Sequence, residues 1–240
     1  MLEQFTEMRQ LLMVYEFALE TMVLKVNLLR EDFHLLRDYN PIEHVNYRVK
    51  SPQSILDKAR RKGIGFTPAS LRENLLDIAG LRLTCSFKND IYQVRDHLLR
   101  HEDVILLEEK DYIAEPKPNG YQSLHLIVEV PVLLGDTTER VPVEIQLRTV
   151  AMDFWASLEH KIYYKYHGHV PRHLTDSLKL AADMASTMDT TLERLYEEVR
   201  SLSPETGPET GDPLLPLFDA IKQTTLGSGE LGSSSEPDSD

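Results

Sequence analysis

Apolar residues recur at three- and four-residue steps near both ends of the chain, which is the spacing of one face of an α-helix. Between Met8 and Leu36 this spacing predicts a long amphipathic N-terminal helix. The helix is expected to end near Asn40-Pro41, because proline lacks the backbone donor that would continue a helix and clashes with the preceding turn.

A second long helix is predicted from Leu174 to Leu202, where the apolar steps alternate regularly between four and three residues. The residues that follow this alternation are Leu174, Leu178, Ala181, Ala185, Met188, Leu192, Leu195 and Val199. Such an alternation is the heptad pattern of helices that pack side by side, and we call these residues the heptad seam. Its partner could be the N-terminal helix or another subunit.

The middle of the chain shows the two-residue alternation that is typical of strands. The predicted strands are 81–87, 104–113, 123–130 and 140–148, and the predicted helices between and after them are 90–99 and 149–166. A further helix is expected to begin at Pro52, with Ser51 as its N-cap, and to stop at Gly63.

Composition and cysteine usage exclude several classes of protein. With 41% hydrophobic residues and no apolar run of eighteen, the sequence predicts no transmembrane helix. The first residues are charged from position 3 and lack the apolar core of a signal peptide. The single cysteine, Cys85, permits no intramolecular disulfide, which favours a reducing cytoplasm, and its apolar strand setting predicts a buried structural thiol.

The net charge of −13 is unevenly distributed. Residues 203–240 are acidic and rich in Pro, Gly and Ser, so we expect a disordered tail, with Leu214–Ile221 as a weak local exception. Residues 48–62 instead form a compact basic island. An acidic protein repels nucleic acid at long range, so this island indicates a pocket for a small polyanion, although a solvated basic helix face has the same composition.

Three polar side chains share one face of the strand predicted at 140–148. Val141 and its apolar companions point into a core, whereas Glu144, Gln146 and Arg148 point to the opposite face. A carboxylate, an amide and a guanidinium in a row are groups that a metal-bound polyphosphate needs. The alternative interpretation is a polar outer face with an incidental glutamate.

Two other segments have matching chemistry. Arg48 and Lys50 precede the helix that begins at Pro52, whose free N–H groups favour an anion, and Lys58 and Arg61 extend the positive charge along that helix. The sequence holds neither a Walker loop nor the protein-kinase signatures. Asp77 lies just before a strand, where it and Glu144 could share one Mg²⁺, unless it is only a turn or cap residue.

The loop that contains Lys117, Asn119, Gly120 and Tyr121 is rich in turn-forming residues. A tyrosine that follows a glycine can lie flat and stack on a base. Ser123 and His125 follow and share a strand face. The alternatives are a packed surface aromatic for Tyr121 and a hydrogen-bonded sheet histidine for His125.

These motifs follow one another in a particular order along the chain. They are Arg-x-Lys-x-x-x-Ser, Asp-Ile-Ala-Gly-Leu-Arg, Lys-x-Asn-Gly-Tyr-x-Ser-x-His, Val-Glu-Ile-Gln-x-Arg-Thr and Phe-Trp-Ala-Ser-Leu-Glu-His. In this order they closely resemble the synthetase domain of the RelA/SpoT family in its single-domain form, the small alarmone synthetases. The resemblance covers about residues 40–168, within an expected domain of residues 1–202 that precedes the tail.

The resemblance implies a fold and an activity. The fold is an α+β, nucleotidyltransferase-like mixed sheet flanked by helices, with long N- and C-terminal helices. The reaction transfers the β,γ-pyrophosphate of ATP to the ribose 3′-OH of GDP or GTP, giving (p)ppGpp and AMP with the help of Mg²⁺. The resemblance also points to a bacterial cytoplasmic enzyme and a closed homo-oligomer, often a tetramer.

Family roles can be carried over residue by residue. The residues implied to hold the ATP phosphates and base are Arg48, Lys50, Ser54, Lys58 and Arg61, with Arg82 stacked on adenine. Asp77 and Glu144 would bind Mg²⁺, and Glu144 would help to deprotonate the 3′-OH. Tyr121 would stack on guanine. The other residues implied to contact the acceptor or its phosphates are Lys117, Asn119, Ser123, His125, Gln146 and Arg148.

Two departures from longer or regulated relatives follow from the resemblance. The sequence has no His-Asp dipeptide, the pair on which the family's hydrolase domain is built, so we expect no hydrolysis of the product. His44 and Asp153 stand where the product-activated branch carries a phenylalanine and an asparagine, so we expect no activation by product.

Two other classes of protein remain open from the sequence. A catalytically inactive nucleotide-binding scaffold would lack a metal ligand, but Asp77 and Glu144 are both present. A single-stranded RNA-binding module would need a broad basic groove with several exposed aromatics, which the net charge of −13 disfavours.

Overall fold

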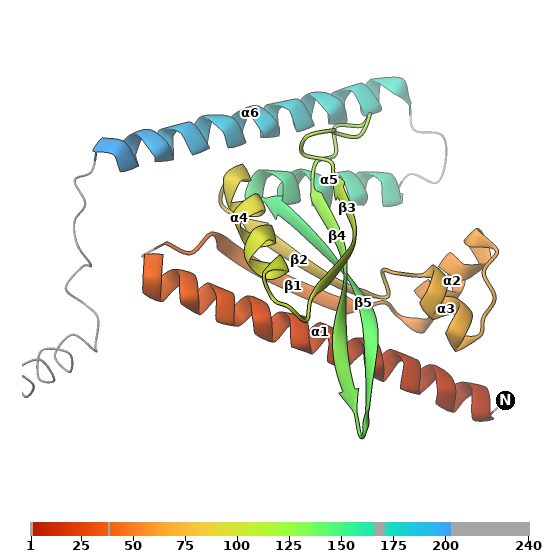
Figure 1. Ribbon diagram of the computed structural model, residues 1–240. Helices are drawn as coiled ribbons and strands as arrows, with labels where there is room; N and C mark the ends of the chain where they lie inside the picture. The colour runs from red at the N-terminus through yellow and green to blue at the C-terminus, as the bar shows by residue number, and fades with distance from the viewer. Residues whose placement is uncertain (1, 38, 166–170, 203–240) are drawn as a thin grey trace, which may run out of the picture. The chain divides into compact units, whose positions relative to one another are not determined.

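The computed structural model describes residues 2–37, 39–165 and 171–202, which include all the helices and strands labelled in Figure 1. The chain forms two units, Met1–Glu198 and Val199–Asp240, and the sheet and the candidate site belong to the first. The expectation of a disordered tail at residues 203–240, with its exception at Leu214–Ile221, lies outside the described residues. In the described part, no helix is long and apolar enough to cross a membrane.

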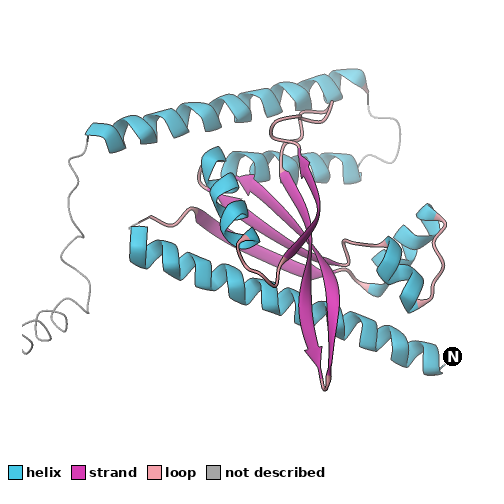
Figure 2. Cartoon of the chain, viewed as in Figure 1, coloured by secondary structure: helices cyan, strands magenta, loops and turns pink. Residues whose placement is uncertain are grey.

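The centre of the first unit is a sheet of five strands in the order β1-β2-β5-β4-β3. Figure 2 draws its strands in magenta among the cyan helices. The strands are β1 (Ile42–Val49), β2 (Ala79–Cys85), β3 (Ile105–Asp111), β4 (Leu124–Leu134) and β5 (Thr137–Thr149). β2 and β5 are parallel, whereas the other neighbouring pairs are antiparallel. This mixed sheet with flanking helices confirms the predicted α+β class.

Six helices accompany the sheet in the described residues. They are α1 (Leu2–Arg37), α2 (Pro52–Lys62), α3 (Pro68–Asn74), α4 (Lys88–Leu99), α5 (Val150–Lys165) and α6 (Arg172–Leu202). The sequence pattern did not predict β1 or α3. β1 is mostly exposed on both faces and therefore lacks apolar alternation, and α3 has only seven residues, too few to show a helical period.

The core lies between one face of the sheet and two helices. Leu83 of β2, Leu126 of β4 and Ile145 of β5 point to this face and are fully buried. α1 covers it with Met22 and Phe33, among other side chains that water does not reach (Figure 1). The Phe33 ring meets the His97 ring of α4 with centroids 4.9 Å apart. Because successive residues of a strand alternate, the polar residues of β2 and β5 lie on the opposite face.

The buried thiol predicted at Cys85 is confirmed. Its side chain has no exposed surface and points into this core. Burial raises the pKa of the Cys85 thiol, since the charged thiolate is disfavoured away from water. Cys85 is therefore a small apolar core residue rather than a nucleophile.

α6 packs on the domain mainly through residues outside the heptad seam, although Leu178 of the seam also packs against the cluster of Trp155 and Ala182. Its inward residues include Ala182 and Asp189, both buried. The Thr149 hydroxyl donates to the Asp189 carboxylate at 2.7 Å, and the Trp155 indole N–H donates to the backbone carbonyl of Leu178 at 2.9 Å. Met188 of the seam is 50% exposed, and Leu192 and Leu195 are exposed to a similar extent. The first of the two expected partners, the N-terminal helix, therefore does not cover the seam.

Candidate active site

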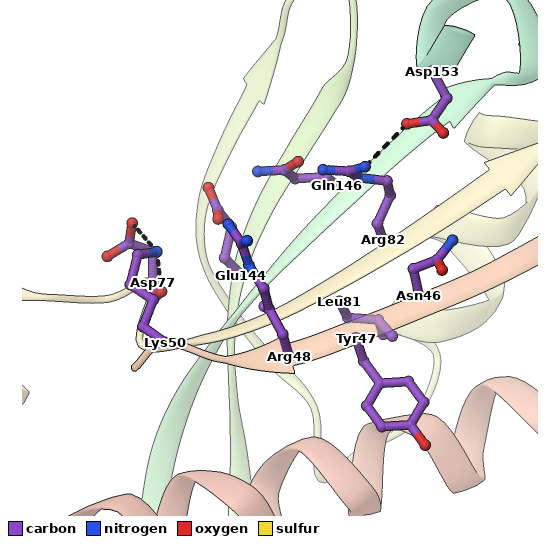
Figure 3. A pocket seen from close by; sticks show the side chains of 11 residues that line it. Asn46, Tyr47, Arg48, Lys50, Asp77, Leu81, Arg82, Glu144, Gln146 and Asp153 are labelled. Atoms are coloured by element: carbon purple, nitrogen blue, oxygen red, sulfur yellow. Dashed lines mark hydrogen bonds and ion pairs between the residues drawn. The ribbon is translucent and has the colours of Figure 1, made fainter. Parts of the chain in front are cut away.

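A polar cavity of about 380 Å³ opens on the sheet face that is opposite α1 (Figure 3). The predicted site residues that line it are Arg48, Lys50, Asp77, Arg82, Glu144 and Gln146. Asn46, Tyr47 and Asp153 also line it, and none of these three was predicted as a substrate contact. The cavity therefore gathers residues from β1, β2 and β5 together with the segment that leads into β2 and the first turn of α5.

Strand register explains how residues distant in sequence come together. Gly80 of β2 lies between Arg48 of β1 and Glu144 of β5. Because glycine has no side chain, the space between this guanidinium and this carboxylate stays open. One row further, Arg82 lies beside Gln146, whose other neighbour is His125 of β4. Two adjacent rows of the sheet thus supply the floor of the cavity.

Asp77 holds two lysines at one end of the cavity, and we call Lys50, Lys58 and Asp77 the Asp77 cluster. The Lys50 ammonium donates to the Asp77 carboxylate at 2.8 Å and to its backbone carbonyl at 2.6 Å. The Lys58 ammonium contacts the same carboxylate oxygen, Oδ2. Burial would raise the pKa of Asp77, but hydrogen bonds and charges from the two lysines outweigh it, so the net pKa is lowered and the carboxylate is ionised.

The helix that carries Lys58 is fixed at both ends, as its sequence predicted. Ser51 caps α2 by accepting the backbone N–H of Ser54 at 3.3 Å. Gly63 ends it with a φ of 67°, a conformation that suits glycine. On this frame Ile55 and Ala59 face the core and Lys58 reaches the cavity edge, while Ser54 and Arg61 are exposed. Ser54 and Arg61 do not line the cavity.

The two carboxylates suit a magnesium ion that is completed by substrate oxygens. Asp77 Oδ1 is buried and has no hydrogen-bond partner. Burial would raise the pKa of Glu144, but the hydrogen bond and charge of the nearby His125 outweigh this effect. The net pKa of Glu144 is lowered, so this carboxylate is ionised as well. In the described residues no three His, Cys, Asp or Glu side chains come together to hold a metal on their own. Mg²⁺ is usually bound by one or two carboxylates and substrate phosphates, which fits this pair.

A second group of side chains lies beside Glu144, and we call Lys117, Tyr121, His125 and Arg148 the Tyr121 cluster. The Arg148 guanidinium donates to the Tyr121 hydroxyl at 2.7 Å, and that hydroxyl lies 2.7 Å from His125 Nε2. Because arginine only donates, the tyrosine hydroxyl can donate to Nε2. The remaining His125 proton then sits on Nδ1, 3.5 Å from Glu144 Oε1. The Lys117 ammonium lies over the Tyr121 ring, 4.7 Å from its centroid.

The loop that carries Tyr121 is supported by α5 and α6. Gly120 has a φ of 88°, and a Cβ atom there would meet the Cβ of Ala182 at 2.5 Å. The Asn119 amide donates to Glu159 of α5 at 3.1 Å, and its carbonyl accepts the Tyr121 backbone N–H at 3.2 Å. The positive φ of Gly120 and its close approach to Ala182 explain why the loop needs glycine between Asn119 and Tyr121.

Several contacts of this region were absent from the sequence-based prediction. Tyr112, just beyond β3, meets the His125 ring edge-on at 5.3 Å and lies under Lys117 at 4.4 Å. Strand pairing alone brings Tyr112 here, so no local signal revealed it. Ser123 is fully buried, and its hydroxyl donates to the Leu147 carbonyl at 3.0 Å. Ser123 therefore ties β4 to β5, and this arrangement does not support its expected contact with the acceptor.

The two residues that the resemblance assigned to an effector position, His44 and Asp153, differ in their surroundings. His44 is an exposed residue of β1 that pairs with Thr84. Asp153 lines the cavity itself, and its Oδ1 lies 3.1 Å from Arg148 and 3.3 Å from Arg82.

Known proteins resemble the chain in both sequence and fold. Residues 47–169 match the family described as "Region found in RelA / SpoT proteins". The chain is 53% identical to GTP pyrophosphokinase YwaC of Bacillus subtilis over 174 residues, which cover 72% of this chain and 83% of that protein. The chain therefore belongs to the RelA/SpoT family, and the expected family membership is confirmed.

Solved structures place the likeness among small members of that family. The crystal structure of small alarmone synthetase 2 from Bacillus subtilis superposes with a TM-score of 0.73 at 48% identity, covering 80% of this chain and 99% of that one. Small alarmone synthetase 1 of the same organism, bound to its product pppGpp, superposes with a TM-score of 0.73 at 39% identity, covering 80% and 97%.

Proposed function

We propose that this protein is a GTP pyrophosphokinase that transfers the β,γ-pyrophosphate of ATP to the ribose 3′-OH of GDP or GTP. The observation that carries the proposal is the pair of ionised carboxylates, Asp77 and Glu144, in one cavity with Arg48, Lys50 and Arg82. This mixture of charges suits a metal-bound polyphosphate. The names of the similar proteins, a GTP pyrophosphokinase and alarmone synthetases, support the same reaction.

The donor nucleotide is assigned to the part of the cavity near the Asp77 cluster. Arg48, Lys50 and Lys58 neutralise the phosphates of ATP, with help from Ser54 and Arg61 on the exposed side of α2. The flat guanidinium of Arg82 stacks on adenine opposite Arg48, since planar guanidinium groups stack well on aromatic rings. Positioning and charge neutralisation of this kind supply most of the catalysis in phosphoryl transfer.

The acceptor nucleotide is assigned to the Tyr121 cluster. Tyr121 stacks on guanine, an interaction worth roughly 1–3 kcal/mol per base. Lys117, Asn119 and Arg148 contact the acceptor or its phosphates, as do His125 and Gln146 from neighbouring strands. The donor and acceptor subsites then meet at Glu144, which lies between Gly80 and Ile127 in the sheet.

Asp77 and Glu144 are the residues that would hold Mg²⁺, which when bound neutralises phosphate charge. Glu144 also accepts the proton of the attacking 3′-hydroxyl, because a hydroxyl is a poor nucleophile until a base acts on it. His125 orients this carboxylate from its other side. The new bond joins the 3′-oxygen to the β-phosphorus, while the bond from that phosphorus to the α-phosphate oxygen breaks and leaves AMP.

A direct assay tests the reaction. Purified protein is incubated with ATP, Mg²⁺ and either GDP, GTP or GMP, and the products are separated by anion-exchange chromatography. The proposal predicts AMP together with a guanine nucleotide that carries a 3′-pyrophosphate. Release of ADP, the product of an ordinary kinase, would contradict it, as would a complete lack of reaction with every acceptor.

We further propose that the enzyme makes alarmone without degrading it and works in the cytoplasm of a bacterium. The support for the first point is the lack of a His-Asp dipeptide in the sequence. Purified product incubated with the enzyme, with and without Mn²⁺, should remain intact. Release of pyrophosphate from it would contradict this part of the proposal.

We also propose a closed homo-oligomer with an even number of subunits, such as a tetramer. The exposed seam residues Met188 and Leu192 support it, because large apolar stripes on a helix usually pack against another chain. Asp introduced at either position should dissociate the oligomer. Light scattering that finds a monomer at micromolar concentration for the unmodified protein would contradict the assembly.

A further inference from the structure

One carboxylate in the cavity links two arginines from adjacent parallel strands. Asp153 lies in the first turn of α5, directly after β5 ends. Its Oδ1 lies 3.3 Å from the Arg82 guanidinium of β2 and 3.1 Å from the Arg148 guanidinium of β5 (Figure 3 draws the first contact). Thr149 fixes the start of α5, since its hydroxyl accepts the backbone N–H of Met152 at 3.1 Å. Asp153 is thereby held in place over both strands.

The two arginines need this counter-ion. Arg148 has a side chain that is 6% exposed, and Arg82 is 37% exposed. Burial is the main reason that the pKa of the Arg82 guanidinium is lowered, and the positive charge of Arg148 adds to the same effect. Two neighbouring guanidinium groups, one buried and one partly exposed, repel each other, so a carboxylate that both can share stabilises their close approach.

The contact also determines how each guanidinium is turned. A guanidinium is planar and donates through its edge, so an edge bound to Asp153 leaves the flat face available for stacking. Arg148 donates from its other terminal nitrogen to the Tyr121 hydroxyl at 2.7 Å and to Gln146 at 3.1 Å. Through Arg148, the same carboxylate also determines where the Tyr121 ring lies. Arg82 and Tyr121 are the residues proposed above to stack on adenine and on guanine.

We propose that Asp153 is a positioning residue that couples the two nucleotide subsites, holding the adenine platform Arg82 and the guanine platform Tyr121 in one fixed relation. This inference rests on the proposed function. It gives Asp153 a role inside the substrate cavity, whereas the family resemblance had assigned its position only to an effector site. A nucleotide that stacks on one platform restricts the remaining side-chain motion of Arg82, Asp153 and Arg148, so the second nucleotide binds at a smaller entropic cost.

The coupling can be measured by binding, without turnover. Isothermal titration calorimetry gives the Kd of a non-hydrolysable ATP analogue with and without saturating GDP, in the presence of Mg²⁺. The wild type should bind the analogue several-fold more tightly when GDP is present. Asp153→Ala should lose this ratio and weaken analogue binding roughly tenfold, the size expected when a charge-assisted hydrogen bond is removed. Asp153→Asn keeps one acceptor oxygen, so its binding ratio and its Kd for the analogue should lie between those of the wild type and Asp153→Ala.

Steady-state kinetics supply the second readout. Asp153→Ala should raise KM for ATP and for GDP together, with a smaller loss of kcat, because the residue touches neither reacting atom. Asp183→Asn is the matched control, since Asp183 is an exposed residue of α6 that pairs with Lys179 at 2.9 Å. This control should keep both KM values and the binding ratio. Thermal unfolding of each variant confirms that the comparison is made between folded proteins.

The possible results separate the inference from the proposed function. If the wild type makes no alarmone, the proposed function fails whatever Asp153 does. If it makes alarmone but Asp153→Ala keeps an unchanged binding ratio, the inference alone fails. A wild-type ratio of one also overturns it. Tighter nucleotide binding by Asp153→Ala overturns it as well, because Asp153 would then be an internal competitor for substrate phosphate.

Discussion

The Asp77 cluster is attached directly to the sheet and to a capped helix, whereas Lys117 and Tyr121 of the Tyr121 cluster sit on a loop that depends on α5 and α6 for its shape. Lys50 and Lys58 both contact the partly buried carboxylate of Asp77, and Lys50 also donates to the Asp77 backbone carbonyl. Tyr121 instead belongs to a chain of contacts through His125 and Arg148. The proposed donor side is thus determined by local chain geometry, and the proposed acceptor side by tertiary packing.

This difference predicts which substrate's KM a distant substitution should change. A substitution on α5 or α6 can move the loop of Tyr121 without touching the Asp77 cluster. A substitution near Asp77 removes charge from the donor side and leaves the loop in place. Measurements that separate the KM of ATP from the KM of the acceptor are therefore the most informative test of the comparison.

The largest effect is expected where the two sides meet. Glu144→Gln and Asp77→Asn each remove a charge that would hold Mg²⁺, and this stabilisation matters mainly in the transition state. Each should reduce kcat by about a hundredfold or more while circular dichroism shows a folded protein. Asp57→Asn, an exposed change on α2, is the control. Retention of more than roughly a tenth of wild-type kcat, 1.4 kcal/mol, would remove the residue concerned from the metal site.

The next largest effect should distinguish the two sides. Tyr121→Ala removes the proposed stacking surface, so the KM of GDP or GTP should rise roughly 5- to 150-fold, the range that corresponds to 1–3 kcal/mol. The KM of ATP should change much less, because ATP is affected only through the contacts of Arg148 and Asp153. Tyr121→Phe keeps the ring but loses the hydroxyl contacts with His125 and Arg148, so it should show a smaller rise. An equal loss for both substrates would place Tyr121 outside the acceptor side.

Gly120→Ala tests the support that α6 gives the loop. The new methyl would lie 2.5 Å from the Ala182 Cβ at a φ of 88°, so the loop must shift. We expect the acceptor KM to rise several-fold, with little change for ATP. Gly135→Ala is the control for backbone strain alone, since Gly135 has a φ of 58° and open space around it. The pair Gly120→Ala with Ala182→Gly should recover part of the loss, and no recovery would argue against this contact.

The smallest expected effect is on the free energy of unfolding at low pH, and it involves only Asp77 on the donor side. The pKa of Asp77 is lowered from 3.8 in the folded protein, because the two lysines outweigh its burial. The folded protein therefore binds this proton more weakly than the unfolded chain does. The stabilisation is present above the ordinary pKa and is lost as pH falls through the lowered folded value. In urea unfolding, the difference between wild type and Asp77→Asn should shrink as pH drops below about 4. A difference that is constant with pH would contradict the lowered pKa.

Sequence reasoning succeeded where chemistry follows strand alternation. The alternation around Ile145 placed Glu144 and Gln146 on a common polar face, and the structure confirms this placement. It could not predict the ion pairs of Asp153, since they join α5 to two strands that are adjacent only through the sheet order. The family resemblance included Ser123 among the acceptor contacts, and the alternation placed it on the strand face of His125; neither could predict the bond from its buried hydroxyl to the Leu147 carbonyl.

The heptad seam shows a second limit of pattern reasoning. The sequence showed the apolar period of α6, yet the helix packs on its own domain mainly through a stripe that includes Ala182 and Asp189, with Leu178 of the seam beside it. Small and polar residues on that stripe gave no hydrophobic signal. Only the tertiary contacts of Thr149 and Trp155 reveal which face of the helix is turned inward.

The indole that bonds to Leu178 gives this protein an intrinsic optical reporter. Trp155 is the single tryptophan of the chain, and it packs with Ala182 in a small cluster against which Tyr121 and Leu178 lie. Fluorescence excited in the indole band therefore originates beside the loop of Tyr121 and beside the part of α6 that supports this loop. Emission should respond strongly when guanine nucleotide is added and more weakly to ATP alone, through the contacts of Asp153 and Arg148, so that nucleotide binding can be followed without labels.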